Sequence, residues 1–295
     1  MIIATRGSAL ALWQAQWVAG RLEGVEILTI KTTGDRLAGA SLVEAGGKGL
    51  FTKEIEEALL EGRADVAVHS LKDLPTGMDD RLVVAAVPRR EDPRDALVGR
   101  RLAELGRGSR VGTSSPRRKA QLLHLRPDLT VQDIRGNVDT RLRKLDEGHY
   151  DAVVLAAAGL RRLGQDGRIA EVLDAEVMCP AVGQGALAIQ CRADDAETRR
   201  RLAALEDPAT RAEVTAERAM LAGLGGGCRV PIGGWAREAG NRLRLEAVVA
   251  SVDGSELVRV RVEGETADPE GLGRRASREL LERGAARILE QTPAS

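Results

Sequence analysis

Short apolar runs alternate with segments of helical periodicity through the first 90 residues. The apolar runs predict buried strands at residues 2–5, 25–30, 64–69 and 82–87. The periodic segments predict helices at about residues 8–23 and 51–60, the first with Ser8 as its N-cap. The glycine-rich stretch 35–47 lacks periodicity and is expected to be a mobile loop. Strands that alternate with helices in this way predict parallel βαβ units.

The same alternation begins again after Glu91-Asp92-Pro93-Arg94. It predicts strands at residues 110–112, 130–133 and 151–155, with helices near 115–125 and 138–147. Residues 180–185 are expected to form a hinge, after which the strand 186–190 returns to the first unit. We therefore expect two doubly wound α/β domains, the first made of residues 1–88 and 186–205 and the second of residues 93–179.

The pattern changes in the last third of the chain. Two helices, at about residues 195–205 and 208–221, are followed by alternating strands at 235–238, 243–252 and 257–263. A hairpin turn is expected at Asp253-Gly254, and a long helix at about residues 269–289. This order of elements predicts a small α+β third domain over residues 208–295.

Composition narrows the classes of partner. The chain of 295 residues carries 44 basic and 44 acidic side chains, so no overall charge favours nucleic acid or an anionic membrane. Aromatic residues make up only 2%, too few for a surface that stacks single-stranded bases. Of the basic residues only six are lysine, and arginine is suited to small polyanionic ligands. Genomic base composition or a hot habitat is the alternative source of part of this arginine excess.

The three cysteines are Cys179, Cys191 and Cys228. An odd number without paired spacing argues against a disulfide framework and against a metal site. Together with the lack of an apolar stretch long enough to span a bilayer, this predicts a cytoplasmic protein that is not bound to a membrane.

Polar residues collect directly after predicted strands. Arg6 and Ser8 follow the first strand, and Ser70, Lys72 and Asp73 follow the third. The stretch 113–118 combines hydroxyl side chains, a helix N-terminus and two arginines, a pattern that suits an anion. The alternative for this stretch is an ordinary helix cap with solvated arginines. Three further arginines extend the same face of a predicted cleft: Arg135, Arg141 and Arg162.

Two other features of the sequence each have two interpretations. Cys228 lies in a run of glycines beside Arg229, which predicts an exposed thiol with a lowered pKa; the alternative is a structural turn with an incidental cysteine. His69 is expected to be a packed residue at a strand end rather than a base.

Eight motifs extend from the first predicted strand to the third domain. They are Ile3-Ala4-Thr5-Arg6, Ala11-Leu12-Trp13-Gln14-Ala15, Gly46-Gly47-Lys48-Gly49-Leu50-Phe51, Val68-His69-Ser70-Leu71-Lys72-Asp73, Val111-Gly112-Thr113-Ser114-Ser115, Arg135-Gly136-Asn137-Val138, Pro180-Ala181-Val182-Gly183-Gln184-Gly185 and Gly226-Gly227-Cys228. Together these motifs resemble the porphobilinogen deaminase (hydroxymethylbilane synthase) family.

This resemblance implies two periplasmic-binding-protein-like domains joined by a hinge, with a small third domain. The implied activity is that of a transferase, which condenses four porphobilinogen molecules head to tail into hydroxymethylbilane and releases ammonia at each step. A dipyrromethane cofactor, bound to Cys228 as a thioether, is implied as the primer from which the product is finally hydrolysed. The alternative is a non-catalytic, hinged anion-binding module. The protein is expected to be a monomer.

The resemblance also implies a role for each matching residue. Asp73 is the implied catalytic residue, which stabilises the cationic azafulvene left by loss of ammonia and moves protons. The residues implied to hold the cofactor are Cys228, Ser70, Lys72, Thr113, Ser114, Ser115, Arg117 and Arg118. Those implied to bind substrate are Arg6, Ser8, Gln14, Lys48, Phe51, Arg135, Arg141 and Arg162.

The chain departs from the family pattern at two positions. Glu44 stands where many relatives have lysine, and we expect it to point away from the acidic substrate. Pro116 replaces a common leucine and suits the first position of a helix. Lys48 and Phe51 belong to the loop that is expected to cover the site.

Overall fold

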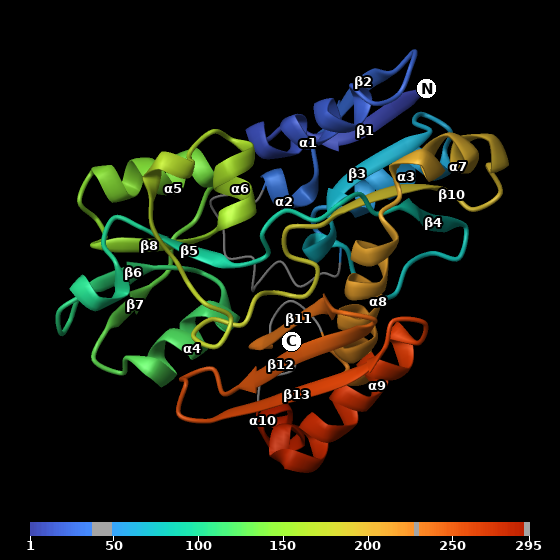
Figure 1. Cartoon of the computed structure of the whole chain (residues 1–295). Coiled ribbons are helices and arrows are strands. Elements are labelled where there is room, and N and C mark those ends of the chain that lie inside the picture. The colour runs from blue at the N-terminus through green and yellow to red at the C-terminus, as the bar shows by residue number, and fades with distance from the viewer. Residues whose placement is uncertain (37–48, 227–229, 292–295) are drawn as a thin grey trace. The chain divides into compact units, whose positions relative to one another are not determined.

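The computed structural model describes residues 1–36, 49–226 and 230–291 (Figure 1). Glu44, Lys48, Cys228 and all but the first two residues of the loop expected at 35–47 lie outside the described residues. The chain forms two compact units, one of residues 1–91 and 185–211 and the other of residues 92–184 and 212–295. The three-domain division remains a prediction.

The first unit contains a five-stranded sheet in the order β2-β1-β3-β10-β4. Its strands are β1 (Ile2–Arg6), β2 (Glu26–Ile30), β3 (Val66–Ser70), β4 (Leu82–Ala86) and β10 (Leu187–Arg192). β1 runs parallel to β2 and β3, whereas β10 runs antiparallel to β3 and β4. The predicted parallel pairing and the predicted return of the chain to this unit are therefore confirmed, and β10 adds an antiparallel strand to the sheet.

Helices cover both faces of this sheet because its apolar side chains alternate. Ile3 and Val68 belong to one buried cluster with Val18, while Ala4 belongs to another with Ile55. The elements are α1 (Ala9–Ala19), α2 (Thr33–Arg36), α3 (Lys53–Leu60), the 3₁₀ turns η1 (Leu71–Asp73) and η4 (Ala203–Leu205), and α7 (Ala196–Leu202). Ser8 caps α1 as predicted, since its side chain accepts a hydrogen bond from the Ala11 N–H.

The second unit contains a sheet of the same topology, in the order β7-β6-β8-β5-β9. Its strands are β5 (Asp95–Val98), β6 (Arg110–Gly112), β7 (Thr130–Gln132), β8 (Ala152–Ala156) and β9 (Ile169–Val172). β5 and β9 were not predicted. In each sheet the strand that runs antiparallel to the central strands, β10 or β5, is the first strand after the chain crosses over from the other unit. Two sheets with this shared order form a fold of the periplasmic-binding-protein type.

Alternation along β8 again buries both faces. Val154 packs with Leu122 of α4 (Pro116–Leu125), whereas Val153 packs with Leu142 of α5 (Val138–Asp146) and Leu160 of α6 (Ala157–Arg162). Two short 3₁₀ turns complete this part of the unit: η2 (Leu102–Glu104) and η3 (Asp166–Arg168).

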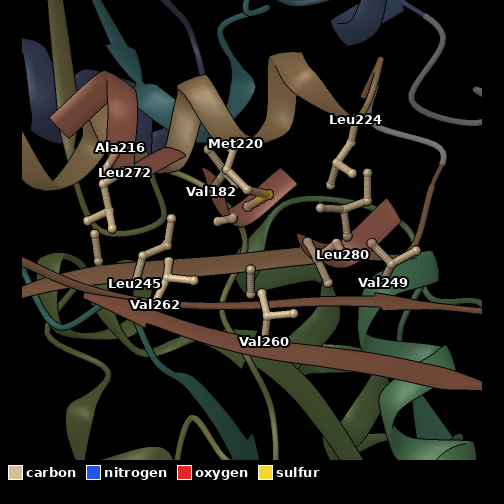
Figure 2. Close-up of a cluster of buried hydrophobic side chains, with 14 of the residues drawn as sticks. Val182, Ala216, Met220, Leu224, Leu245, Val249, Val260, Val262, Leu272 and Leu280 are labelled. Atoms are coloured by element: carbon tan, nitrogen blue, oxygen red, sulfur yellow. The ribbon is translucent and has the colours of Figure 1, made fainter. Parts of the chain in front are cut away.

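A three-stranded antiparallel sheet follows, made of β11 (Ile232–Ala239), β12 (Arg242–Ala250) and β13 (Leu257–Glu265). Figure 2 shows side chains of α8 (Pro208–Gly223) and α9 (Pro269–Leu280) meeting apolar side chains of this sheet in one core. Gly273 permits the close approach of the two helices, since a Cβ there would lie 2.3 Å from the Ala216 carbonyl oxygen.

The single long helix expected at the C-terminal end is interrupted. A π-helical turn, η5 (Leu281–Ala285), separates α9 from α10 (Ala286–Glu290), and Gly284 has a φ of 103° there. The predicted turn at Asp253-Gly254 is present, and the Gly254 carbonyl lies 2.9 Å from His124 Nδ1 on α4. Across the described ranges, no helix combines the length and hydropathy that crossing a bilayer requires.

Candidate active site

A pocket opens at the carboxyl ends of β1 and β3, which lie together because these strands are parallel neighbours. Its empty space, which is open to solvent, is about 420 Å³. It brings together six of the predicted site residues: Arg6, Ser8, Gln14, Phe51, Ser70 and Asp73. Leu10, Ala11, Thr52, Ile55, Val68 and His69 complete its lining.

Asp73 is exposed at the end of the η1 turn and makes no hydrogen bond or ion pair to another described residue. The turn itself is held by the Leu71 N–H, which donates to the Ala186 carbonyl at 3.0 Å. Beside it, Gln14 Nε2 donates to Ser70 Oγ at 2.8 Å. This bond fixes the backbone position of Asp73, while the carboxylate oxygens remain available to a ligand.

Arg6 lies between a carboxylate and an aromatic ring. It forms an ion pair with Asp35 at 2.5 Å, and its guanidinium carbon lies 4.1 Å from the centre of the Phe51 ring. Asp35 was not among the predicted site residues. Lys72 belongs to the same η1 turn as Asp73 but does not line the pocket.

His69 is buried, with 5% of its surface exposed, as the sequence predicted. Its Nε2 lies 3.1 Å from Gln190 Oε1, and Gln190 Nε2 donates to Glu56 Oε1 at 2.9 Å. Because the Gln190 oxygen faces the ring, Nε2 is the nitrogen that carries the proton. Burial and the charge of Arg6 lower the pKa of His69 to about 4, although the hydrogen bond to Gln190 raises it. The imidazole is therefore neutral at physiological pH.

We expect this neutral histidine to make the protein less stable as the pH falls. The unfolded chain binds a proton on His69 near its usual pKa of 6.5, whereas the folded chain does so only near 4. Stability should therefore decline from about pH 6.5 to pH 4, by up to roughly 3 kcal/mol from this residue. Urea unfolding at several pH values should show this component in the unaltered protein and its loss in His69→Gln.

His149→Gln is the matched control, because the His149 side chain is 61% exposed. If the stability of His69→Gln and of His149→Gln depended on pH as that of the unaltered protein does, the role given to His69 would be wrong.

In the second unit, the hydroxyls of residues 113–115 shape the N-terminus of α4. Ser115 is the N-cap, and Pro116 begins the helix, both as predicted. Thr113 Oγ1 accepts a hydrogen bond from the Ser115 N–H at 3.2 Å, and Ser114 Oγ donates to the Ile134 carbonyl at 2.8 Å. These hydroxyls fix the local backbone, and two of them accept hydrogen bonds from N–H groups at the start of α4, those of Ser115 and Arg118.

Arg117 and Arg118 are buried and share one carboxylate, that of Asp95 at the start of β5. Arg117 Nη1 lies 2.7 Å from Asp95 Oδ2, and Arg118 Nη2 lies 2.7 Å from Oδ1. Gln184 Nε2 also donates to Asp95 Oδ1 at 2.8 Å, and Arg117 Nη1 donates to the Cys179 carbonyl at 2.7 Å. The alternative of solvated arginines is therefore wrong. Their contact with the cofactor stays a prediction.

Arg141 adds a third positive charge to this region. Its Nε donates to the Gly136 carbonyl at 2.8 Å, and it has no ion pair within the described part of the chain. Burial and the nearby Arg118 lower the pKa of Arg141 to about 10. Three guanidiniums against the one carboxylate of Asp95 leave two uncompensated positive charges, which a ligand with several carboxylates would neutralise. Arg135 and Arg162 lie in the same unit, near the start of α5 and at the end of α6.

Sequence reasoning missed three polar residues that hold the arginines of these sites or their carboxylate partner: Asp35, Asp95 and Gln184. Asp35 had a usable signal, since it stands shortly after the carboxyl end of a predicted strand. Asp95 had none, because it is the first residue of a strand that was itself missed.

Two family models cover most of the chain. "Porphobilinogen deaminase, dipyromethane cofactor binding domain" matches residues 1–200, and "Porphobilinogen deaminase, C-terminal domain" matches residues 211–282. The chain belongs to the porphobilinogen deaminase family. The porphobilinogen deaminase of Pelobacter propionicus is 51% identical over 98% of this chain and 96% of its own length. That of Roseiflexus sp. is 52% identical, with 98% of both chains covered.

Membership of the porphobilinogen deaminase family decides between the two functions that the sequence left open. The family is one of enzymes that carry a dipyrromethane cofactor, so the enzyme prediction is confirmed and the non-catalytic anion-binding module is not supported. The roles of individual residues rest on the geometry described above and stay predictions.

Proposed function

We propose that this protein condenses four porphobilinogen molecules head to tail into hydroxymethylbilane, with release of ammonia at each step, and that Asp73 is its catalytic residue. The observation that carries the proposal is the pocket of the first unit. It gathers Arg6, Gln14, Ser70 and Asp73 from elements up to 67 positions apart in the sequence, all of them residues that the family resemblance implied.

The residues of the second unit fit a group with several carboxylates. The cluster of Arg117, Arg118 and Arg141 exceeds the charge of Asp95 by two, and Arg141 has no ion pair among the described residues. Each pyrrole of a dipyrromethane carries two carboxylates, which guanidinium groups bind in a bidentate manner. When bound, the dipyrromethane supplies the pyrrole carbon on which the chain grows.

The side chains of the pocket divide the remaining work. The Asp73 carboxylate accepts hydrogen bonds from the pyrrole N–H of the substrate and stabilises the positive charge that develops on its ring as ammonia leaves. The same carboxylate can move a proton to the leaving amine and from the attacking ring. Arg6, Ser8 and Gln14 bind and orient the carboxylate side chains of the substrate.

Covalent loading through Cys228 is tested by intact mass. We expect the purified protein to exceed its sequence mass by two linked pyrroles and Cys228→Ser to have the mass of the bare chain. Burial raises the pKa of the Cys179 thiol to about 12 and that of Cys191 to about 11, so neither is a good nucleophile at neutral pH. Cys191→Ala is the control and should remain loaded. A loaded Cys228→Ser protein would contradict the assignment.

The proposal extends to the setting in which the enzyme works. Zero net charge supports a small-molecule substrate without nucleic acid or membrane as partner. Cys179 and Cys191 are buried and unpaired, which supports a reducing, cytoplasmic environment. The protein is proposed to act as a monomer, which its sedimentation at equilibrium would test.

A further inference from the structure

The Asp35 carboxylate is fixed by two neighbours in the first unit. Arg6 Nη2 and Nε donate to Asp35 Oδ1 at 2.5 and 3.2 Å. The Thr32 N–H and hydroxyl donate to Oδ2 at 3.1 and 2.8 Å. Burial alone would raise the pKa of Asp35, but these bonds lower it, so the group is ionised at neutral pH. A charged carboxylate with this many donors holds the guanidinium in one orientation.

The Phe51 ring lies against one face of the same guanidinium. The Arg6 guanidinium carbon lies 4.1 Å from the centre of the ring, and the ring lies against Gly34, the residue before Asp35. A Cβ at Gly34 would lie 2.1 Å from Phe51 Cε1, so only glycine fits there. The Gly34 N–H also donates to the Leu50 carbonyl at 2.8 Å. Asp35 and Phe51 therefore belong to one joined support behind Arg6.

A guanidinium can offer two edges to carboxylates, one made of Nε and Nη2 and one made of Nη1 and Nη2. Asp35 occupies the first edge of Arg6, and Nη1 has no hydrogen-bond partner among the residues that the structure describes. Arg6 lines the pocket together with Ser8, Gln14 and Asp73. The edge that remains is suited to one carboxylate of a ligand in that pocket.

We propose that Asp35 is a positioning residue, which aims the Nη1 edge of Arg6 at the pocket so that it binds a single carboxylate of porphobilinogen. This inference rests on the proposed function, because it takes the pocket to be the porphobilinogen site. The opposite role for Asp35 is that of a competitor, which neutralises Arg6 and must be displaced by the substrate. The two roles predict changes in KM of opposite sign.

The test compares Asp35→Asn with the unaltered protein. Removing the hydrogen-bond partners that orient metal ligands typically costs about 10- to 100-fold in affinity or activity. By the same reasoning for an oriented guanidinium, we expect KM for porphobilinogen to rise about tenfold or more, with a much smaller change in kcat. Asp79→Asn is the matched control, since Asp79 pairs with Arg81 on the surface of the same unit and does not line the pocket. An unchanged or lower KM in Asp35→Asn would overturn the proposal.

A double variant shows that Asp35 acts through Arg6. In an Arg6→Gln background the further change Asp35→Asn should leave KM where Arg6→Gln alone puts it. If the two effects multiply instead, Asp35 does not act by orienting Arg6 and the proposal is wrong. Thermal unfolding of all variants separates this outcome from a general loss of structure, which would lower Tm without the selective change in KM.

Direct binding keeps this inference distinct from the proposed function. If the unaltered protein released no ammonia from porphobilinogen, the proposed function would fail. Calorimetric titration with porphobilinogen would still decide the role of Asp35, because Asp35→Asn should bind it about tenfold or more weakly than Asp79→Asn does. Equal affinities, or no binding to the unaltered protein, would overturn the positioning role.

Discussion

Asp73→Asn should fold normally and lose porphobilinogen turnover by at least about 100- to 1,000-fold, the usual cost of removing one preorganised electrostatic partner. The substitution keeps the size and shape of the side chain and removes its charge. Asp73 is exposed and has no partner among the described residues, so its loss should cost the fold little. The positive charge that develops on the substrate would then lack the one carboxylate that the described residues contribute to the pocket lining.

The measurement is the rate of ammonia release, with circular dichroism and thermal unfolding as checks on the fold. Asp80→Asn is a close control, because Asp80 is also an exposed aspartate of the first unit but lies outside the pocket lining. It should keep the rate of the unaltered protein. A near-normal rate in Asp73→Asn would remove this residue from the mechanism.

Local signals in the sequence predicted much of this structure. Ser8 and Ser115 cap helices where a hydroxyl residue precedes a periodic segment, and β10 forms in the first sheet from an apolar run after a glycine-rich stretch. These features depend on residues close together in the chain. Capping and strand burial are therefore visible before the fold is known.

β5 and β9 were missed because they are short and carry charged residues. β5 has four residues, of which the first is Asp95, and β9 contains Glu171, so neither presents an uninterrupted apolar run. Both run antiparallel to their neighbours in the second sheet, β5 to β8 and β9 to β5. A pattern that predicts parallel βαβ units gives no place to such strands.

The partners of the site arginines were also hidden from the sequence. Arg117 is 22 residues from Asp95, and Arg6 is 29 residues from Asp35. No spacing rule relates residues at such separations, because the fold alone brings them together. The sequence thus named candidate cations of the site, but not the carboxylates that pair with three of them: Arg6, Arg117 and Arg118.

Asp95→Asn should destabilise the second unit by about 3–5 kcal/mol, the usual cost of removing one partner from a buried ion pair. Asp95 is fully buried, and Arg117 and Arg118 are 5% and 6% exposed. The variant would leave both guanidiniums without a carboxylate, beside the charge of Arg141. A lower urea midpoint and a lower Tm would measure this loss of stability. The fraction of protein loaded with cofactor, measured by intact mass, should also fall.

Asp128→Asn provides the contrast, because Asp128 pairs with Arg126 at 2.7 Å where both side chains are partly exposed. Surface pairs contribute about 0–1 kcal/mol, so this variant should unfold almost as the unaltered protein does.

Burial alone would raise the pKa of Asp95, but the charges of Arg117 and Arg118 hold it well below its usual range. The contribution of Asp95 is therefore complete above its unfolded pKa and is lost only in strong acid. The loss of stability in Asp95→Asn should accordingly be the same at pH 6 and pH 8. If Asp95→Asn and Asp128→Asn were equally stable, Asp95 would not neutralise the buried arginines.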